Sequence, residues 1–323
     1  MKKILLFVVV GIVALFVVCY FIPVKKEKEI FVASTFQNII SSVSQPANWV
    51  KWYPPAMEIW QKDSSTYTFK IDSSNNISNI NANGKKIKVT QLTALLYEVE
   101  EDNNPKSLFG LSVIPYVGNN QMQSEHNSRI AYAWRSNLLF YLLPFLEDAF
   151  ANTVVDNLRA YLESPLRFYG FDIALKQTTD TIFVTQNENC TQQELFTKLP
   201  VLFGNLEKFA QKKQVNWDGN KNVAYTFLNN DSLYVVAGIN INKVVDGEFV
   251  TNVMQLPGGQ ILAVGRFEGI FRDRLKLYKA MRLYLADHQL QLMGASFEKY
   301  LSALPKSEND SVKIDICFPL RQY

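Results

Sequence analysis

The sequence is poor in the residues on which many catalytic centres depend. Among its 323 residues there are two histidines and three widely separated cysteines. Two histidines leave little material for a catalytic triad or a histidine-based metal site, and three cysteines are too few for a disulfide framework or a zinc cluster. The sequence therefore predicts no metal and no other cofactor.

The chain also lacks a strong excess of charge of either sign. Its 33 basic and 30 acidic residues give a formal net charge of +3. Five of these lysines and two glutamates flank an apolar run at the N-terminus, so the rest of the chain has equal numbers of basic and acidic residues. A neutral body lacks the basic surface that nucleic acid binding requires, and nucleic acid is therefore not an expected partner.

The N-terminal apolar run, ILLFVVVGIVALFVVCYFI at residues 4–22, has about the length needed to cross a bilayer. No small-x-small cleavage site follows it, which favours a permanent anchor over a cleaved signal peptide. We therefore expect residues 1–29 to form a single-pass membrane anchor, with the lipid bilayer as a partner. Lysines on both sides of the run leave open on which side of the membrane the body lies.

Residues 30–165 have the pattern of an α+β domain. A short strand and a brief helix are followed by several strands, separated by turn formers such as SSNN and NANG. A helix over residues 146–164 closes the segment, because apolar residues recur there at helical spacing. These apolar residues are Phe150, Val154, Leu158 and Tyr161.

Three segments of this domain carry a family resemblance. They are NWVKWYP after the first helix, SRIAYAWRSN as the last strand, and NLRAYLES at the end of the long helix. In this order they resemble the SRPBCC superfamily, the START-like and polyketide-cyclase-like helix-grip proteins. The resemblance implies a curved sheet around one long helix, with a cavity for a hydrophobic ligand between them. Trp49 is expected at the mouth of this cavity and Trp134 in its wall.

Residues 172–323 contain the same order of elements twice. A strand, a helix and two further strands are expected over residues 181–242, and the same order recurs over residues 259–320. The two halves have nearly the same length, which indicates a duplication. In the helix of the first half, Pro200 is expected to mark the helix start or a kink.

The second half contains PGGQILAVGRFEGIF, then the helix, then SFEKYLSALPKSENDSVKIDICFPL. This order is similar to the GyrI-like domain, which is also the effector-binding domain of multidrug-sensing transcription regulators. The positions that match the family pattern are Pro257, Gly258, Gly269, Glu298, Tyr300 and Pro319. No DNA-binding helix-turn-helix precedes the domain, so a transcriptional role is not expected.

Glu298 is the main candidate for a functional residue. Side chains alternate along a strand, so Glu298 and Tyr300 share one face while Phe297 and Leu301 share the other. We expect the apolar pair to pack against the helices, which would leave Glu298 and Tyr300 facing a groove between the two halves. The aromatic residues expected to line this groove with them are Tyr225, Phe227 and Trp217.

A carboxylate in an apolar groove is poorly solvated and needs a positive partner. A lipophilic cation would supply the charge, and aromatic faces would add cation–π attraction. The GyrI-like resemblance implies such a ligand at Glu298. Some GyrI-like proteins are hydrolases in which the matching glutamate helps to activate water, so Glu298 as a general base is an alternative. A scaffold whose pockets are filled by side chains is a third.

The sequence thus predicts a membrane-anchored α+β protein with a helix-grip domain and a duplicated GyrI-like domain. Its expected function is the binding of hydrophobic or amphipathic small molecules, cations among them, without catalysis. The alternative is a hydrolase of small electrophilic compounds that uses Glu298. The identity of the ligand, the oligomeric state and any communication between the domains stay open.

Overall fold

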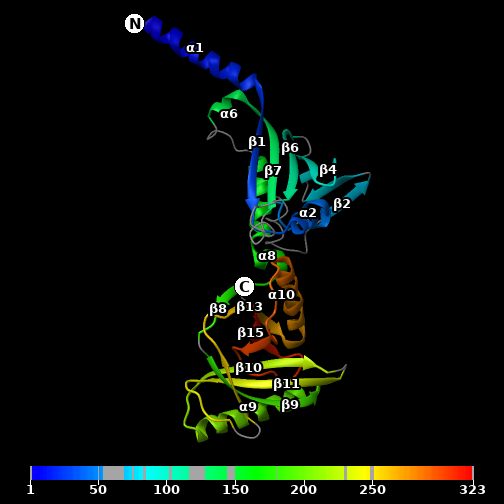
Figure 1. The fold of residues 1–323 in the computed structure, drawn as a ribbon. Coiled ribbons are helices and arrows are strands. Elements are labelled where there is room, and N and C mark those ends of the chain that lie inside the picture. The colour runs from blue at the N-terminus through cyan, green and yellow to red at the C-terminus, as the bar shows by residue number, and fades with distance from the viewer. Residues whose placement is uncertain are drawn as a thin grey trace. The chain divides into compact units, whose positions relative to one another are not determined.

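The chain forms two compact units, Met1–Arg167 and Phe168–Tyr323, which are described separately (Figure 1). The computed structural model describes residues 2–49, 51–53, 69–74, 76–82, 85–101, 104–115, 128–143, 150–179, 181–228, 231–247 and 251–321.

The N-terminal helix α1 (Lys2–Phe21) contains most of the apolar run and leads into strand β1 (Pro23–Val32). Among the described residues, no helix combines the length and the apolar character that crossing a bilayer requires. The predicted transmembrane anchor over residues 4–22 is therefore wrong, as is the membrane localisation derived from it, and the bilayer as a partner has no support.

The first unit contains a seven-stranded antiparallel sheet in the order β1-β7-β6-β5-β4-β3-β2. Beyond β1, its strands are β2 (Phe69–Ser74), β3 (Ile77–Ala82), β4 (Lys85–Gln91), β5 (Leu96–Glu101), β6 (Asn104–Pro115) and β7 (Ser128–Asn137). Its helices are α2 (Phe36–Ser44), α3 (Pro46–Trp49), α6 (Leu138–Leu142) and α7 (Phe150–Leu162), and α8 (Pro165–Tyr169) leads into the second unit.

Helix α7 packs against β6 and β7 through its apolar side. Val154, Leu158 and Tyr161 are buried on this side, as the spacing of the sequence predicts. The Tyr132 hydroxyl of β7 donates a hydrogen bond to Oδ1 of Asn152 on α7 at 2.7 Å, which fixes the helix on this face of the sheet. Residues 146–149, where the sequence predicts the helix to begin, lie outside the described residues.

The second unit contains an eight-stranded antiparallel sheet in the order β12-β9-β11-β10-β14-β15-β13-β8. Its strands are β8 (Ile173–Gln177), β9 (Thr181–Thr191), β10 (Trp217–Phe227), β11 (Ser232–Ile241), β12 (Asn252–Leu256), β13 (Ile261–Ile270), β14 (Phe297–Tyr300) and β15 (Ser311–Pro319). Its helices are α9 (Leu195–Lys212), the 3₁₀ turn η3 (Phe271–Arg274) and α10 (Leu275–Asp287).

The strand order of this sheet reflects the repeat in the sequence. β9, β11 and β10 of the first half are mirrored by β13, β15 and β14 of the second, and the two halves meet where β10 pairs with β14. The strand that precedes each half in the sequence pairs with a strand of the other half. β8, which precedes the first half, pairs with β13, and β12, which precedes the second, pairs with β9. At the seam between the halves, Val223 of β10 lies directly opposite Glu298 of β14.

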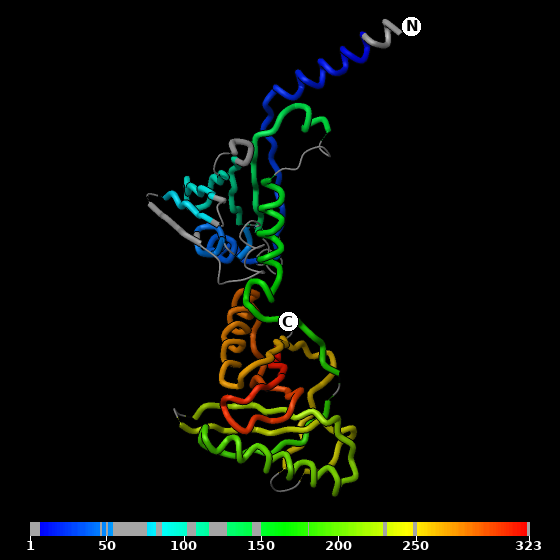
Figure 2. The backbone as a smooth tube through the Cα atoms, turned by 180° about the vertical axis from the view of Figure 1, so that it is seen from behind, coloured from blue at the N-terminus to red at the C-terminus, as the bar shows by residue number. Residues whose placement is uncertain are grey.

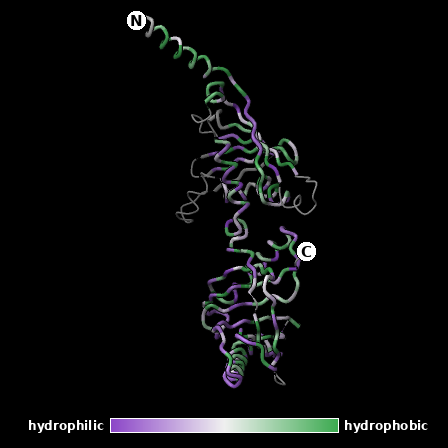
Figure 3. The backbone as a smooth tube through the Cα atoms, turned by 60° about the vertical axis from the view of Figure 1, so that its left-hand side comes forward, coloured by the Kyte–Doolittle hydropathy of each residue, from purple (hydrophilic) through white to green (hydrophobic). Residues whose placement is uncertain are grey.

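Both helices cover the same face of the sheet and bury one side of each strand. Helix α9 lies against β9 and β11, and α10 lies against β13 (Figure 2). Gly265 of β13 allows the close approach of α10, since a Cβ atom there would lie 2.7 Å from Leu277 Cδ1 and 2.8 Å from Met281 Sδ. Hydrophobic and hydrophilic residues are interspersed along the elements of this unit, as expected when each has one buried face (Figure 3).

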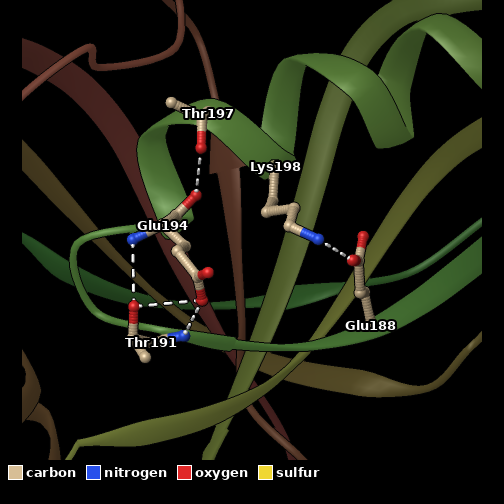
Figure 4. Close-up of polar contacts among 5 residues, drawn as sticks. All are labelled: Glu188, Thr191, Glu194, Thr197 and Lys198. Atoms are coloured by element: carbon tan, nitrogen blue, oxygen red, sulfur yellow. Dashed lines mark hydrogen bonds and ion pairs between the residues drawn. The ribbon is translucent and has the colours of Figure 1, made fainter.

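Helix α9 begins after a reciprocal pair of hydrogen bonds between Thr191 and Glu194 (Figure 4). The backbone N–H of Glu194 donates to Oγ1 of Thr191 at 3.2 Å, and the backbone N–H of Thr191 donates to Oε2 of Glu194 at 2.9 Å. The sequence TQQE thus forms a capping box. Lys198 in the first turns of the helix forms an ion pair with Glu188 of β9. The helix starts at Leu195, directly after Glu194, and continues through Pro200, so the proline does not set the start.

Thr191→Ala is expected to lower the free energy of unfolding by about 1 kcal/mol, because the N–H of Glu194 loses its acceptor. Hydrogen bonds from the backbone N–H and the hydroxyl of Thr191 hold the pKa of Glu194 below its usual value, so the part of the loss that comes from the hydroxyl–carboxylate bond is present at neutral pH and disappears as the pH falls through that lowered pKa. Urea denaturation at pH 7 and in acid measures both effects. Thr197→Ala, which removes a hydroxyl that only donates to a carbonyl oxygen, is the control. An equal loss at both pH values would contradict the assignment.

Candidate ligand-binding site in the second unit

Glu298 lies at the centre of the second unit, and its side chain is 0% exposed. It points to the face of the sheet that the helices cover, together with Tyr300, which is 3% exposed. Phe297 points to the opposite face and packs against Leu262 and Val264. The predicted orientation of the strand is therefore reversed. Alternation along a strand shows which residues share a face, but it does not show which of the two faces is buried.

The burial of Glu298 is possible because Arg274, the last residue of η3, supplies its positive partner. Nε of Arg274 lies 2.8 Å from Oε1 of Glu298, and the arginine side chain is 12% exposed. Nη1 of Arg274 also donates to the carbonyl oxygen of Phe271 at 3.2 Å. The positive charge that was expected from a ligand is thus present within the chain.

The guanidinium group of Arg274 also lies against aromatic rings. Its Cζ is 3.6 Å from the ring centroid of Phe271 and 5.6 Å from that of Tyr225. Phe271 in turn makes an edge contact with Phe196 of α9, with 5.6 Å between centroids. A flat, delocalised cation is therefore held by a carboxylate on one side and by aromatic faces on others.

Two tyrosines complete the hydrogen bonding of the Glu298 carboxylate, and a third bonds to one of them. The hydroxyl of Tyr278 donates to Oε1 at 3.2 Å, and the hydroxyl of Tyr300 donates to Oε2 at 2.8 Å. The hydroxyls of Tyr225 and Tyr300 are 2.9 Å apart. Because the proton of Tyr300 is directed at the carboxylate, Tyr225 is the donor in this last bond. We call Glu298, Arg274, Tyr225, Tyr278 and Tyr300 the Glu298 cluster.

The electrostatics of the Glu298 cluster keep its three tyrosines neutral and its arginine charged at neutral pH. Burial raises the pKa of Tyr225, Tyr278 and Tyr300 well above 10, and the nearby carboxylate of Glu298 raises it further. Burial opposes the charge of Arg274, but the attraction of Glu298 outweighs it and raises the pKa of Arg274. At neutral pH the tyrosines therefore donate hydrogen bonds and the arginine stays charged.

Sequence reasoning identified Glu298, Tyr300 and Tyr225 but missed Arg274 and Tyr278. The signal that could have found them is their spacing, because residues four apart share one face of a helix. Arg274 immediately precedes α10 and Tyr278 lies in its first turn, so both side chains reach the same carboxylate.

Phe227 and Trp217, the other two residues expected at the site, lie away from it along β10. They are four and six residues from Val223, the residue opposite Glu298, which corresponds to roughly 13 and 20 Å of strand. Phe227 is 61% exposed. Trp217 is half-buried against the core of the unit, beside a β-bulge. The structure therefore does not bring these two residues to the carboxylate.

The predicted ligand-binding residues of the first unit have different environments. Trp49 is 1% exposed, and its ring lies 4.3 Å from that of Trp52. Its indole N–H donates to the carbonyl oxygen of Val43 at 2.8 Å. Trp134 is half-buried, stacks on Tyr132, and lines a hollow of about 720 Å³ with residues of β1, β5 and β6. Protein thus covers Trp49, whereas Trp134 borders open volume.

The geometry does not favour Glu298 as a general base. The carboxylate is fully buried, and its three hydrogen-bond donors are all protein groups. A general base must lie within hydrogen-bond reach of the proton that it removes, directly or through one water. Among the described residues, no group of histidine, cysteine or acidic side chains could hold a metal ion that would activate water instead.

No protein-family model and no curated protein matches the chain. Solved structures match with low identity. The EcmrR–DNA complex in EcmrR-RPo is 13% identical over 58% of this chain and 70% of its own, with a TM-score of 0.42. The EcmrR C-terminal domain is 12% identical over 47% and 99%, with a TM-score of 0.40. SAV2435 bound to tetraphenylphosphonium is 16% identical over 46% and 94%, with a TM-score of 0.32.

At these TM-scores the matches carry no argument about what this chain binds. The GyrI-like resemblance of residues 172–323 therefore stays a proposal. The SRPBCC resemblance of residues 30–165, with a hydrophobic ligand beside Trp134, stays a prediction.

Proposed function

We propose that this protein is a small-molecule-binding protein whose second unit, a GyrI-like domain, binds flat or lipophilic organic cations at Glu298. In the absence of ligand, Arg274 occupies the position of the cation. The observation that carries this proposal is the way in which Arg274 is held: its guanidinium is paired with a fully buried carboxylate and lies 3.6 Å from the ring centroid of Phe271. This environment suits any cation that is flat and weakly hydrated.

A ligand competes with Arg274 on favourable terms if its own desolvation costs little. A charge spread over several rings is less strongly hydrated than a compact ammonium group, so its transfer to a buried site is less costly. Stacking on Phe271 and Tyr225 contributes roughly 0.5–2 kcal/mol per cation–π contact. Arg274 lies at the end of a four-residue 3₁₀ turn with part of its side chain exposed, so it can turn toward solvent when a ligand enters.

Binding without turnover is the proposed activity. The hydrogen bonds of the carboxylate orient it toward a cation and leave it no access to a water molecule in the unliganded site. The tyrosine hydroxyls would continue to donate to the carboxylate after Arg274 leaves, which keeps the negative charge in place for the ligand.

The test is dye binding to the full chain, measured by fluorescence anisotropy with cationic rhodamine 6G and with anionic fluorescein as the reference. Arg274→Met removes the competing cation and is expected to tighten rhodamine binding about tenfold or more, which corresponds to about 1.4 kcal/mol. Glu298→Gln is expected to weaken it by a similar factor. Neither change should alter the weak binding of fluorescein.

Arg266→Met is the matched control, because Arg266 pairs with Asp315 at 2.9 Å on the same unit but is 50% exposed and does not belong to the Glu298 cluster. Partial unfolding would expose apolar surface that binds both dyes, so a gain of affinity in Arg274→Met for the cationic dye alone decides the question. If neither the parent nor Arg274→Met binds the cationic dye, the proposal fails. A scaffold whose pockets are filled by side chains is then the better interpretation.

A further inference from the structure

A groove of about 340 Å³ lies on the face of the second unit's sheet that points away from α9 and α10. Phe297 is among its lining residues and is the neighbour of Glu298 on β14, so the two side chains point to opposite faces. Phe183 and Thr185 of β9, Asn222 of β10 and Met254 of β12 also line it. The groove is therefore separated from the Glu298 cluster by the thickness of the sheet.

The chemistry of the groove differs from that of the Glu298 cluster. None of the described residues that line it is charged. The rings of Phe183 and Phe297 meet edge to face, with 6.2 Å between their centroids. Met254 and Met293 border it with 57% and 53% of their surface exposed, and flexible thioether side chains pack well against aromatic rings. A charged ligand would find no opposite charge here, whereas a neutral aromatic one would.

The groove has room for more than one ring. An engineered apolar cavity of about 150 Å³ holds benzene, and this groove has roughly twice that volume. Its depth depends on Gly238 of β11, where a Cβ atom would lie 3.2 Å from Thr185 Cγ2 and 3.8 Å from Phe183 Cδ1. The absence of a side chain at Gly238 thus keeps volume open beside Phe183.

We infer that this groove is a second binding site, for a neutral aromatic molecule of two or three rings. The volume selects the size of the ligand, the uncharged lining selects against ions, and the two phenylalanine rings with the two methionines select for an aromatic partner. The site goes beyond the proposed cation binding at Glu298, since it uses other residues, the other face of the sheet and the opposite ligand chemistry.

The experiment is titration of the full chain with the neutral dye N-phenyl-1-naphthylamine, followed by its fluorescence. Met293→Glu is expected to weaken binding at least tenfold, because it places a charge at the rim of an uncharged groove. Leu292→Glu is the matched control: this neighbouring residue is 49% exposed and does not line the groove, so the same charge there should leave the affinity within about twofold. Met254→Glu on β12 should reproduce the effect of Met293→Glu from the other side.

The two proposed sites are distinguished in the same titration. The double variant Arg274→Met with Glu298→Leu, which leaves no unpaired buried charge, is expected to keep the affinity for the neutral dye unchanged while it lowers the affinity for rhodamine 6G. The inference is overturned if the parent does not bind the neutral dye, or if Leu292→Glu weakens binding as much as Met293→Glu. It is also overturned if sedimentation shows dimers whose formation excludes the dye, because the groove is then an interface between two copies.

Discussion

Glu298→Gln is expected to lower the free energy of unfolding of the second unit by about 3–5 kcal/mol. The substitution removes the charge that compensates Arg274, whose side chain is only 12% exposed, and leaves a buried guanidinium without an ionic partner. Hydrogen–deuterium exchange read by mass spectrometry localises the effect: peptides covering β10 and β14 should exchange faster, whereas peptides of the first unit should not change. Circular dichroism during urea denaturation gives the magnitude.

A double substitution tests whether this loss comes from the unpaired charge. Replacing both partners, as in Arg274→Met with Glu298→Leu, removes the charges together, and buried ion pairs exchanged for apolar side chains of similar size are often neutral or stabilising. The double variant is therefore expected to be more stable than Glu298→Gln alone. Arg266→Met should change little, because the Arg266–Asp315 pair is half exposed at the arginine. If the Glu298→Gln variant is as stable as the parent, Glu298 is not the charge that compensates Arg274.

Trp52→Ala is expected to destabilise the first unit by about 3–5 kcal/mol, the usual cost of removing a large buried aromatic side chain. Trp52 is 0% exposed, and its ring is stacked obliquely against that of Trp49. Its indole N–H donates to the carbonyl oxygen of Ser42 at 3.2 Å, and this acceptor would lose its partner. Thermal unfolding followed by circular dichroism measures the loss, and exchange in peptides of α2 localises it.

Trp134→Ala is the control for this prediction, because Trp134 has the same side chain but is half-buried beside a hollow. Its removal should cost clearly less, since less apolar surface returns to water. Equal losses for Trp52→Ala and Trp134→Ala would mean that the two tryptophans contribute alike to the core, and the distinction between packing and cavity-lining positions would then be wrong.

The order of elements in the second unit could be predicted from the sequence, because helices and strands differ in the period of their apolar residues. The helix expected in the first half and the last strand expected in the second half both formed, as α9 and β15. The position of Glu298 on a strand followed from the same alternation. Its burial could not be predicted, because it depends on Arg274, a residue 24 positions away that reaches it only after α10 has packed on the sheet.

The membrane anchor shows a different limit. That prediction rested on the length and composition of one apolar run, whereas no helix among the described residues combines the length and apolar character that crossing a bilayer requires. The capping box at Thr191 and Glu194 shows the opposite case. The sequence TQQE is a helix-start signal, and it lies closer to the first residue of α9 than Pro200 does.

The exchange of outer strands between the two repeats has a consequence for how this unit can be divided. β8 and β12 each complete the sheet of the half that they do not belong to in sequence. Removing either repeat would take away the outer strand that pairs with the other repeat. The backbone amides and carbonyls of the strand beside it would then be unpaired, and such an edge readily pairs with other chains. Each repeat therefore needs the outer strand of the other to complete its sheet, and the two are expected to fold only together.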